Sequence, residues 1–116
     1  MPSHEYIRIY GIKTCDTCRK ALKDLTNAGF EPQFVDLREP PLVPETLDLF
    51  TKNFGDRLIN RRSLTWRKLS VEDQSQPEVV LLSKFPTLIK RPIVDSGHRM
   101  TLGWDAEARR AWGVGT

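Results

Sequence analysis

The chain has 116 residues, and its 18 lysines and arginines against 15 aspartates and glutamates leave a net charge of only +3. This length is typical of one compact domain, so we expect residues 1–116 to form a single domain. The small net charge argues against direct binding of nucleic acid, and no apolar stretch approaches the ~20 residues that a membrane-spanning helix needs.

The first predicted elements enclose both cysteines of the chain. The apolar run Tyr6–Tyr10 predicts a strand, and a short loop leads from it to Cys15-Asp16-Thr17-Cys18. Apolar residues then recur at three- and four-residue spacing, which predicts a helix from Cys18 to about Ala28 that ends at Gly29. The two cysteines should therefore lie at the start of a helix.

The next run predicts a second strand. Phe34–Leu37 is short and apolar, and it is bounded by Pro32 on one side and by Pro40-Pro41 on the other. A strand, a helix and a second strand in this order form a unit whose two strands are parallel.

The middle of the chain predicts a helical insertion at about residues 44–85. Pro44 suits the first turn of a helix that ends at Gly55, and shorter helical patterns follow at Ser63–Leu69 and Pro77–Phe85. A polar connection separates the two shorter patterns. This distribution of basic side chains suits a local anion site better than a long surface that follows phosphates, with a solvated surface as the alternative for most of them: Arg57, Arg61, Arg62, Arg67 and Lys68, and again Lys90 and Arg91.

Two short strands and a helix end the chain. Ile93–Asp95 and Arg99–Leu102 flank the turn residues Ser96-Gly97-His98, so they predict an antiparallel hairpin, and Trp104–Trp112 predicts the closing helix. With the first strand, helix and strand, these elements predict an α/β fold. Its centre would be a thioredoxin-like mixed four-stranded sheet, interrupted by the helical insertion.

The spacing of Cys15 and Cys18 indicates thiol chemistry. Two intervening residues allow a disulfide between them, and the N-terminus of a helix lowers the pKa of a thiol. In a reducing cytoplasm, where we expect this protein, such a pair is more often catalytic, redox-sensing or metal-bound than structural. Incidental cysteines and half of a zinc site are the alternatives. Only His4 and His98 remain as further ligands, in segments where surface histidines are usual, so we expect no metal and no bound cofactor.

Three separated motifs resemble the arsenate reductase (ArsC) family, including its Spx and YffB branches. They are Tyr10–Ala21, Arg62-Ser63 and Leu88–Val94, and the resemblance covers roughly Tyr6 to Gly113.

The resemblance implies roles for individual residues. It makes Cys15 the nucleophile and places Arg62 and Arg91 in an anion-binding pocket beside it. Guanidinium groups suit such a pocket because they grip an oxyanion with paired hydrogen bonds, whereas surface salt bridges are the alternative role for these arginines. The resemblance also implies a structural cis-proline at Pro92, for which a strand-edge proline is the alternative.

The chain departs from true arsenate reductases at one place. The arsenate reductases that it resembles carry a third arginine after the hairpin turn, where this chain has Leu102-Gly103-Trp104, a pattern similar to the Spx and YffB branches. This departure argues against arsenate reduction, and whether Arg99 replaces the missing arginine stays open. Cys18 supplies the CxxC of many Spx-like members, which implies an internal disulfide.

Two functions from different classes follow. The first is a thiol-dependent oxidoreductase, in which Cys15 attacks a small anionic or thiol substrate and Cys18, glutathione or another thiol co-substrate resolves the adduct, with glutaredoxin or thioredoxin as a partner. The alternative is an Spx-like redox-switch transcriptional regulator that binds RNA polymerase and responds to a disulfide between Cys15 and Cys18.

Overall fold

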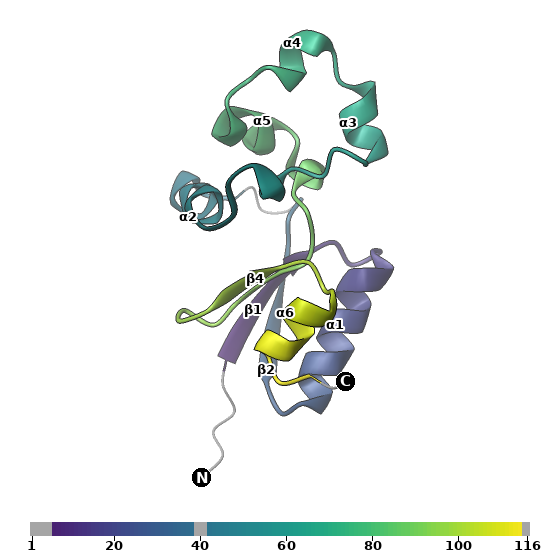
Figure 1. Ribbon diagram of the computed structural model, residues 1–116, viewed down its shortest axis with the longest axis vertical. Coiled ribbons are helices and arrows are strands. Elements are labelled where there is room, and N and C mark those ends of the chain that lie inside the picture. Colours follow the sequence, from purple (N-terminus) through teal and green to yellow (C-terminus); the bar gives the residue numbers. More distant parts are fainter. Residues whose placement is uncertain (1–5, 39–41, 115–116) are drawn as a thin grey trace. The chain divides into compact units, whose positions relative to one another are not determined.

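A mixed four-stranded sheet in the order β2-β1-β3-β4 organises the computed structural model, which describes residues 6–38 and 42–114 (Figure 1). Its strands are β1 (Tyr6–Gly11), β2 (Glu31–Asp36), β3 (Ile93–Asp95) and β4 (Met100–Leu102). β2 runs parallel to β1, whereas β3 is antiparallel to both β1 and β4. The predicted thioredoxin-like mixed sheet and its C-terminal hairpin are confirmed. The proline pair Pro40-Pro41 and the histidine His4 lie outside the described residues.

The chain folds into two compact units. The first contains the sheet with helices α1 (Asp16–Asn27) and α6 (Ala106–Ala111), and the second extends from Leu37 to Lys90. The first unit is therefore built from the two ends of the chain.

One face of the sheet forms the core of the first unit with α1 and α6. In β1 the side chains alternate, so that Ile7 and Ile9 are buried against this core while Arg8 between them is exposed. Two buried tryptophans satisfy their indole N–H groups: Trp104 donates to Asp24 Oδ2 at 3.0 Å, and Trp112 donates to Thr101 Oγ1 at 2.8 Å. The first bond joins the segment before α6 to α1, and the second joins the end of α6 to β4.

Both helices of this unit differ from the prediction at their first residues. α1 begins at Asp16 rather than Cys18, because a polar first turn precedes the apolar periodicity, and it ends before Gly29, whose φ of 98° suits glycine. α6 begins only after Asp105, whose side chain accepts a hydrogen bond from the backbone N–H of Ala108 at 2.9 Å. Trp104, predicted as helical, packs in the core ahead of the helix.

β2 is longer than predicted and includes Pro32. The prediction placed this strand at Phe34–Leu37, but the ladder with β1 starts at Glu31 and pairs Pro32 with Ile7. β2 is an edge strand, and a proline is tolerated there because its missing N–H can face away from the neighbouring strand. Leu37 follows the strand and is fully buried.

The second unit is helical, as predicted for the insertion. Its elements are α2 (Pro44–Phe54), η1 (Gly55–Leu58), α3 (Leu64–Lys68), α4 (Val71–Gln74), α5 (Glu78–Lys84) and η2 (Pro86–Leu88), where η marks a 3-10 helix. The prediction missed α4, which lies in the polar connection and starts where Ser70 Oγ accepts from the backbone N–H of Asp73 at 3.0 Å. Among the described residues, no helix is long and apolar enough to span a membrane.

Candidate active site

Cys15 lies between the end of β1 and the start of α1. Its backbone N–H donates to the carbonyl oxygen of Ile12 at 3.0 Å, and its own carbonyl accepts from the N–H of Arg19 at 3.0 Å. Cys15 is therefore the N-cap of α1, with an extended backbone, and its side chain is half-buried. This position brings its sulfur next to backbone N–H groups that the helix itself does not use.

The pKa of the Cys15 thiol is lowered. Burial is the largest single influence and acts to raise this pKa, but three groups together outweigh it. They are the backbone N–H of Cys18, the Cys18 thiol, and the guanidinium of Arg91, which acts through both a hydrogen bond and its charge. Each of them stabilises the anionic form of sulfur, and this form is the nucleophile.

Cys18 has the opposite character. It lies in the first turn of α1, is fully buried, and has a pKa raised to about 11, first by burial and further by its contact with Cys15. A contact with the backbone of Ile12 acts in the opposite direction, but it does not outweigh the burial. The site thus holds one sulfur suited to attack and one that keeps its proton at neutral pH, and both are free thiols in this structure.

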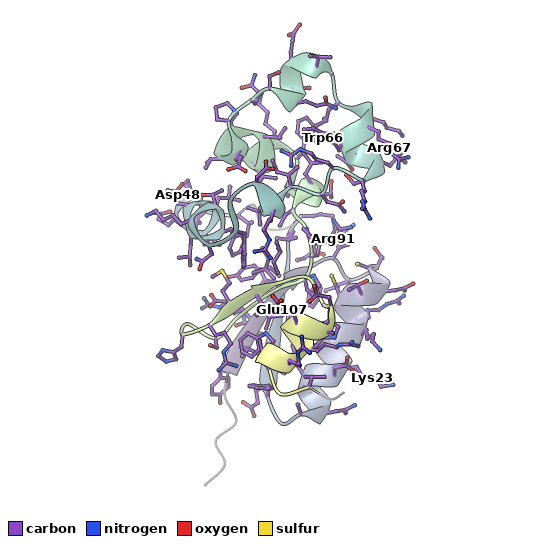
Figure 2. All side chains as sticks on the ribbon, viewed as in Figure 1. Lys23, Asp48, Trp66, Arg67, Arg91 and Glu107 are labelled. Atoms are coloured by element: carbon purple, nitrogen blue, oxygen red, sulfur yellow. The ribbon has the colours of Figure 1, made fainter. Side chains whose placement is uncertain are left out.

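Arg91 reaches Cys15 from the segment that leads into β3. Its side chain, labelled in Figure 2, is half-buried, and the peptide bond between Arg91 and Pro92 is cis, the isomer that the family resemblance implies. The carbonyl oxygen of Pro92 accepts a hydrogen bond from the N–H of Gly103 at 2.8 Å. The end of the hairpin is thereby joined to the Arg91 segment, and Cys15, Cys18 and Arg91 come together although most of the chain separates them in sequence.

Arg99, the candidate for the missing third arginine, contacts the end of α6. Its guanidinium lies over the ring of Trp112, 5.1 Å from the ring centroid, and donates a hydrogen bond to the carbonyl oxygen of Ala111. These contacts hold Arg99 at the C-terminal end of α6. The position after β4, where the arsenate reductases that the chain resembles carry the third arginine, is occupied by Gly103 and by the buried ring of Trp104.

Arg62 belongs to the second unit, in the turn that precedes α3. Its side chain is exposed, and its backbone N–H donates to Asn60 Oδ1 at 3.1 Å. The neighbouring Arg61 is engaged by Asp56 Oδ1 at 2.6 Å and by the ring of Trp66, which Figure 2 labels on α3. The role of Arg62 beside Cys15 stays a prediction.

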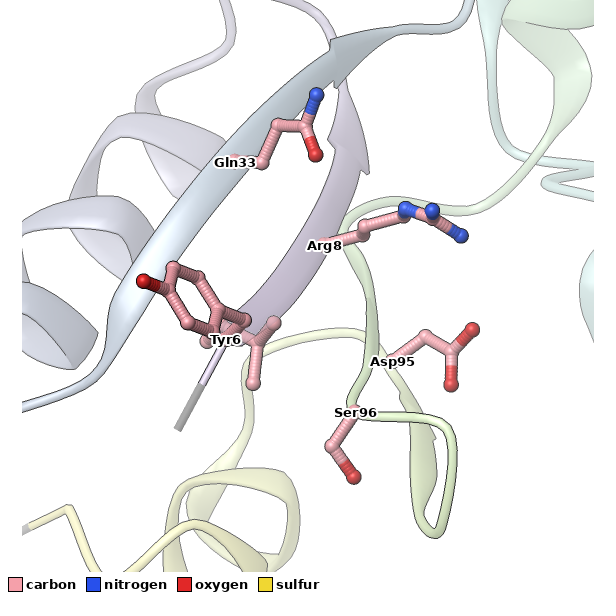
Figure 3. Close-up of a pocket in the computed structure, with 6 residues that line it drawn as sticks. Tyr6, Arg8, Gln33, Asp95 and Ser96 are labelled. Atoms are coloured by element: carbon pink, nitrogen blue, oxygen red, sulfur yellow. The ribbon is translucent and has the colours of Figure 1, made fainter. Parts of the chain in front are cut away.

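A cavity that sequence reasoning missed lies on the exposed face of the sheet. Its volume is about 380 Å³, and it lies near the start of β1 rather than at the end that leads to Cys15 (Figure 3). Alternation along β1 was the signal that could have located it, because residues 6 and 8 share one face. The side chains drawn and labelled at this cavity are Tyr6, Arg8, Gln33, Asp95 and Ser96.

The described residues contain no group of three or more histidine, cysteine or acidic side chains arranged to hold a metal ion. His98, predicted to be a surface residue, is exposed in the hairpin turn. The backbone of Ile12, which contacts the Cys18 sulfur, was not among the predicted site residues. Its contribution comes from the main chain, so its side-chain identity gave no signal.

Curated relatives of this chain cover nearly all of it. An uncharacterized protein from Haemophilus influenzae is 36% identical over 110 residues, which span 90% of this chain and 96% of that protein. A protein from Streptococcus mutans named global transcriptional regulator Spx is 32% identical over 105 residues, or 85% of this chain and 77% of that protein.

Solved structures show the same fold. A protein named YFFB is 29% identical with a TM-score of 0.82, covering 90% of this chain and 96% of that one. An arsenate reductase related protein from Brucella melitensis is 31% identical with a TM-score of 0.75, covering 97% of this chain and 98% of the other. The sequence model of the ArsC family matches residues 10–112, which include both cysteines and Arg91. The chain therefore belongs to the ArsC family, in the branch that contains Spx and YffB-like proteins.

Proposed function

We propose that this protein is a thiol-dependent oxidoreductase in which Cys15 is the nucleophile. The observation that carries the proposal is the lowered pKa of Cys15 together with its cause, since a backbone N–H and the Arg91 guanidinium both act on its sulfur. A thiolate of this kind attacks an oxidised sulfur or an oxyanion, and Arg91 would bind the negative charge of that substrate. Arg62 would complete the anion pocket.

The reaction has two steps. In the first, the Cys15 thiolate attacks an oxidised substrate such as a glutathione disulfide, so that a mixed disulfide forms on Cys15 and one glutathione leaves as a thiolate. In the second, Cys18 attacks the Cys15 sulfur and releases the bound glutathione as a thiolate, or a further glutathione attacks the sulfur of the bound group and releases the Cys15 thiolate. Contact with Cys15 is one cause of the raised pKa of Cys18, and the adduct removes the negative charge of Cys15. Cys18 therefore becomes easier to ionise once the first step has taken place.

The cytoplasm suits this chemistry because its reducing thiols would return the protein to the free dithiol form. Glutaredoxin or thioredoxin would be the protein partner in that return step. Arsenate is the less favoured substrate, because Gly103 and Trp104 stand where a third arginine would be needed and Arg99 is engaged by Trp112.

Intact mass spectrometry tests the proposal directly. The reduced protein is treated separately with oxidised glutathione, arsenate and dilute peroxide, and Cys15→Ser and Cys18→Ser serve as matched variants. We expect one glutathione on Cys18→Ser, no adduct on Cys15→Ser, and a loss of two hydrogens in the wild type as the internal disulfide forms. If the wild type gives no adduct and no disulfide with any reagent, the proposed function is wrong.

A redox-switch regulator is the second candidate. It is favoured by the curated relatives named global transcriptional regulator Spx, of which this chain covers 77% and 84% in two cases. A regulator of this kind would bind RNA polymerase, with affinity that changes when Cys15 and Cys18 form a disulfide. A pull-down of polymerase subunits with the oxidised and the reduced protein distinguishes the candidates. Binding that depends on oxidation supports the regulator, whereas catalytic turnover with glutathione supports the enzyme.

A further inference from the structure

The sulfur of Cys18 occupies the space that a side chain at position 11 would need. A Cβ on residue 11 would lie 2.5 Å from Cys18 Sγ and 3.2 Å from Cys18 Cβ, the first distance being shorter than any real contact of this type. Gly11 is not among the residues with positive φ, so its backbone conformation is open to other amino acids. The requirement for glycine at the end of β1 is therefore one of space.

The Cys18 thiol is enclosed on several sides. Its residue is fully buried, and its sulfur contacts the backbone of Ile12 and the sulfur of Cys15 through hydrogen bonds. The ring of Phe34 on the neighbouring strand borders the same space at position 11, since its Cζ lies 3.4 Å from the position of a Cβ on Gly11. The thiol therefore lies against the end of β1 and beside Cys15.

We infer that Gly11 is a positioning residue for the second step of the reaction, because its missing side chain lets the Cys18 sulfur lie within reach of Cys15. This inference rests on the proposed function, in which Cys15 reacts first. In the second step Cys18 loses its proton to water, its sulfur attacks the Cys15 sulfur of the mixed disulfide, and glutathione leaves as a thiolate. The overall reaction converts one glutathione disulfide and two protein thiols into two glutathione thiols and one protein disulfide.

An alanine at position 11 should displace this sulfur. Ordinary contacts of a Cβ begin at 3.4 Å, so the Cys18 sulfur would have to move by about 1 Å from its present 2.5 Å. Rotation of the Cys18 side chain to another staggered position would carry the sulfur away from Ile12 and from Cys15. Since misplacement of a reacting atom by ~1 Å can lower a rate by ~100-fold, closure of the disulfide should become slow while attack by Cys15 continues.

The experiment follows the two steps separately. Wild type, Gly11→Ala, Cys18→Ala and the double variant are mixed with excess oxidised glutathione, quenched with acid at set times, and analysed by intact mass. Because the Cys18 thiol is one of the groups that lower the pKa of Cys15, we expect Gly11→Ala to slow the first step no more than Cys18→Ala does. The second step should slow by at least about tenfold more than the first in Gly11→Ala. A Gly11→Ala protein that forms the mixed disulfide normally and closes it at the wild-type rate contradicts the role of Gly11 alone. A wild type that forms no mixed disulfide removes the proposed function itself, and this role with it.

A double-mutant cycle on stability separates positioning from a general defect. In urea, Gly11→Ala should lower the unfolding midpoint of the wild type, and should lower that of Cys18→Ala much less, because the sulfur that the new methyl meets is gone. If Gly11→Ala alone does not fold while the double variant does, the conflict with the sulfur is demonstrated. An equal loss in both backgrounds, or failure of both variants to fold, means that residue 11 acts through other neighbours, and the inference is then wrong.

Discussion

Replacing Arg91 should weaken both the nucleophile and the anion site. The guanidinium acts on the Cys15 sulfur through a hydrogen bond and through its charge, and both effects lower the pKa of the thiol. In Arg91→Ala both are lost, so the pKa of Cys15 rises and less thiolate is present at neutral pH. Arg91→Lys keeps the positive charge but loses the planar pair of N–H donors, so we expect a Cys15 pKa between those of the wild type and Arg91→Ala.

The loss of anion affinity can be bounded from the chemistry of the contact. Hydrogen bonds to charged groups contribute about 1.5 to 3 kcal/mol, and an anion held at Cys15 by Arg91 would lose this amount in Arg91→Ala. At ~1.4 kcal/mol for each factor of ten, the dissociation constant for sulfate should rise by about 10- to 150-fold. Arg91→Lys should fall between the wild type and the alanine variant.

Two assays check these values. The rate of alkylation by iodoacetamide against pH reports the ionisation of Cys15, and calorimetry with sulfate reports the anion site. Arg61→Ala and Arg8→Ala are the matched controls, because Arg61 is engaged by Asp56 and Arg8 lines the cavity near the start of β1. Equal sulfate affinity and an unchanged alkylation profile in Arg91→Ala would refute the reasoning, since Arg91 would then be a surface arginine without a role at the site.

Three further results are expected. At pH 7.5 iodoacetamide should label Cys15 and leave Cys18 unmodified in a peptide map, because Cys18 is fully buried with a raised pKa; equal labelling of both would be inconsistent with this site. The pKa of Cys18 is about 11 in the folded protein, against a reference value of 9.0. The buried neutral thiol therefore makes its full contribution to the free energy of unfolding below about pH 9, and this contribution is lost as the pH rises toward 11. Between pH 9 and pH 11, urea titrations should therefore show that the free energy of unfolding falls by ~2 to 3 kcal/mol more in the wild type than in Cys18→Ala. An equal fall in both proteins would contradict the raised pKa of Cys18. Trp112→Ala should lower the free energy of unfolding by ~3 to 5 kcal/mol, because it removes a buried ring that packs edge-on against Phe30, and a loss below ~1 kcal/mol would show that this ring is dispensable.

Local sequence patterns located most of the fold. The spacing of Ala21, Leu22, Leu25 and Ala28 predicts one apolar helix face. Ala21 and Leu25 are fully buried in α1 and Leu22 is half-buried, whereas Ala28 at the end of the helix is exposed. The sequence located the ends of helices and strands less well. A proline inside a strand, or a polar first turn of a helix, does not follow the apolar spacing from which these elements are predicted. Pro32 is accommodated only since β2 is an edge strand, and α4 depends on the cap at Ser70.

The contact between Cys15 and Arg91 could not be read from local pattern. It requires that β3 pair with β1, which places Ile93 opposite Tyr10 and so brings the Arg91 segment to the end of β1. Only the resemblance to a family suggested this contact in advance. The fit of Cys18 against Gly11 was not suggested by either route, because it depends on the position of one sulfur atom relative to a main chain.

The division of the first unit between the two ends of the chain has a consequence during synthesis. A nascent chain emerges from its N-terminus, so Cys15 is exposed well before Arg91 and β3 have been made. Until β3 pairs with β1, the Cys15 thiol lacks the guanidinium that lowers its pKa. The Cys15 thiolate therefore gains the stabilisation that Arg91 supplies only after β3 has been made and has paired, and before that stage oxidants attack Cys15 more slowly.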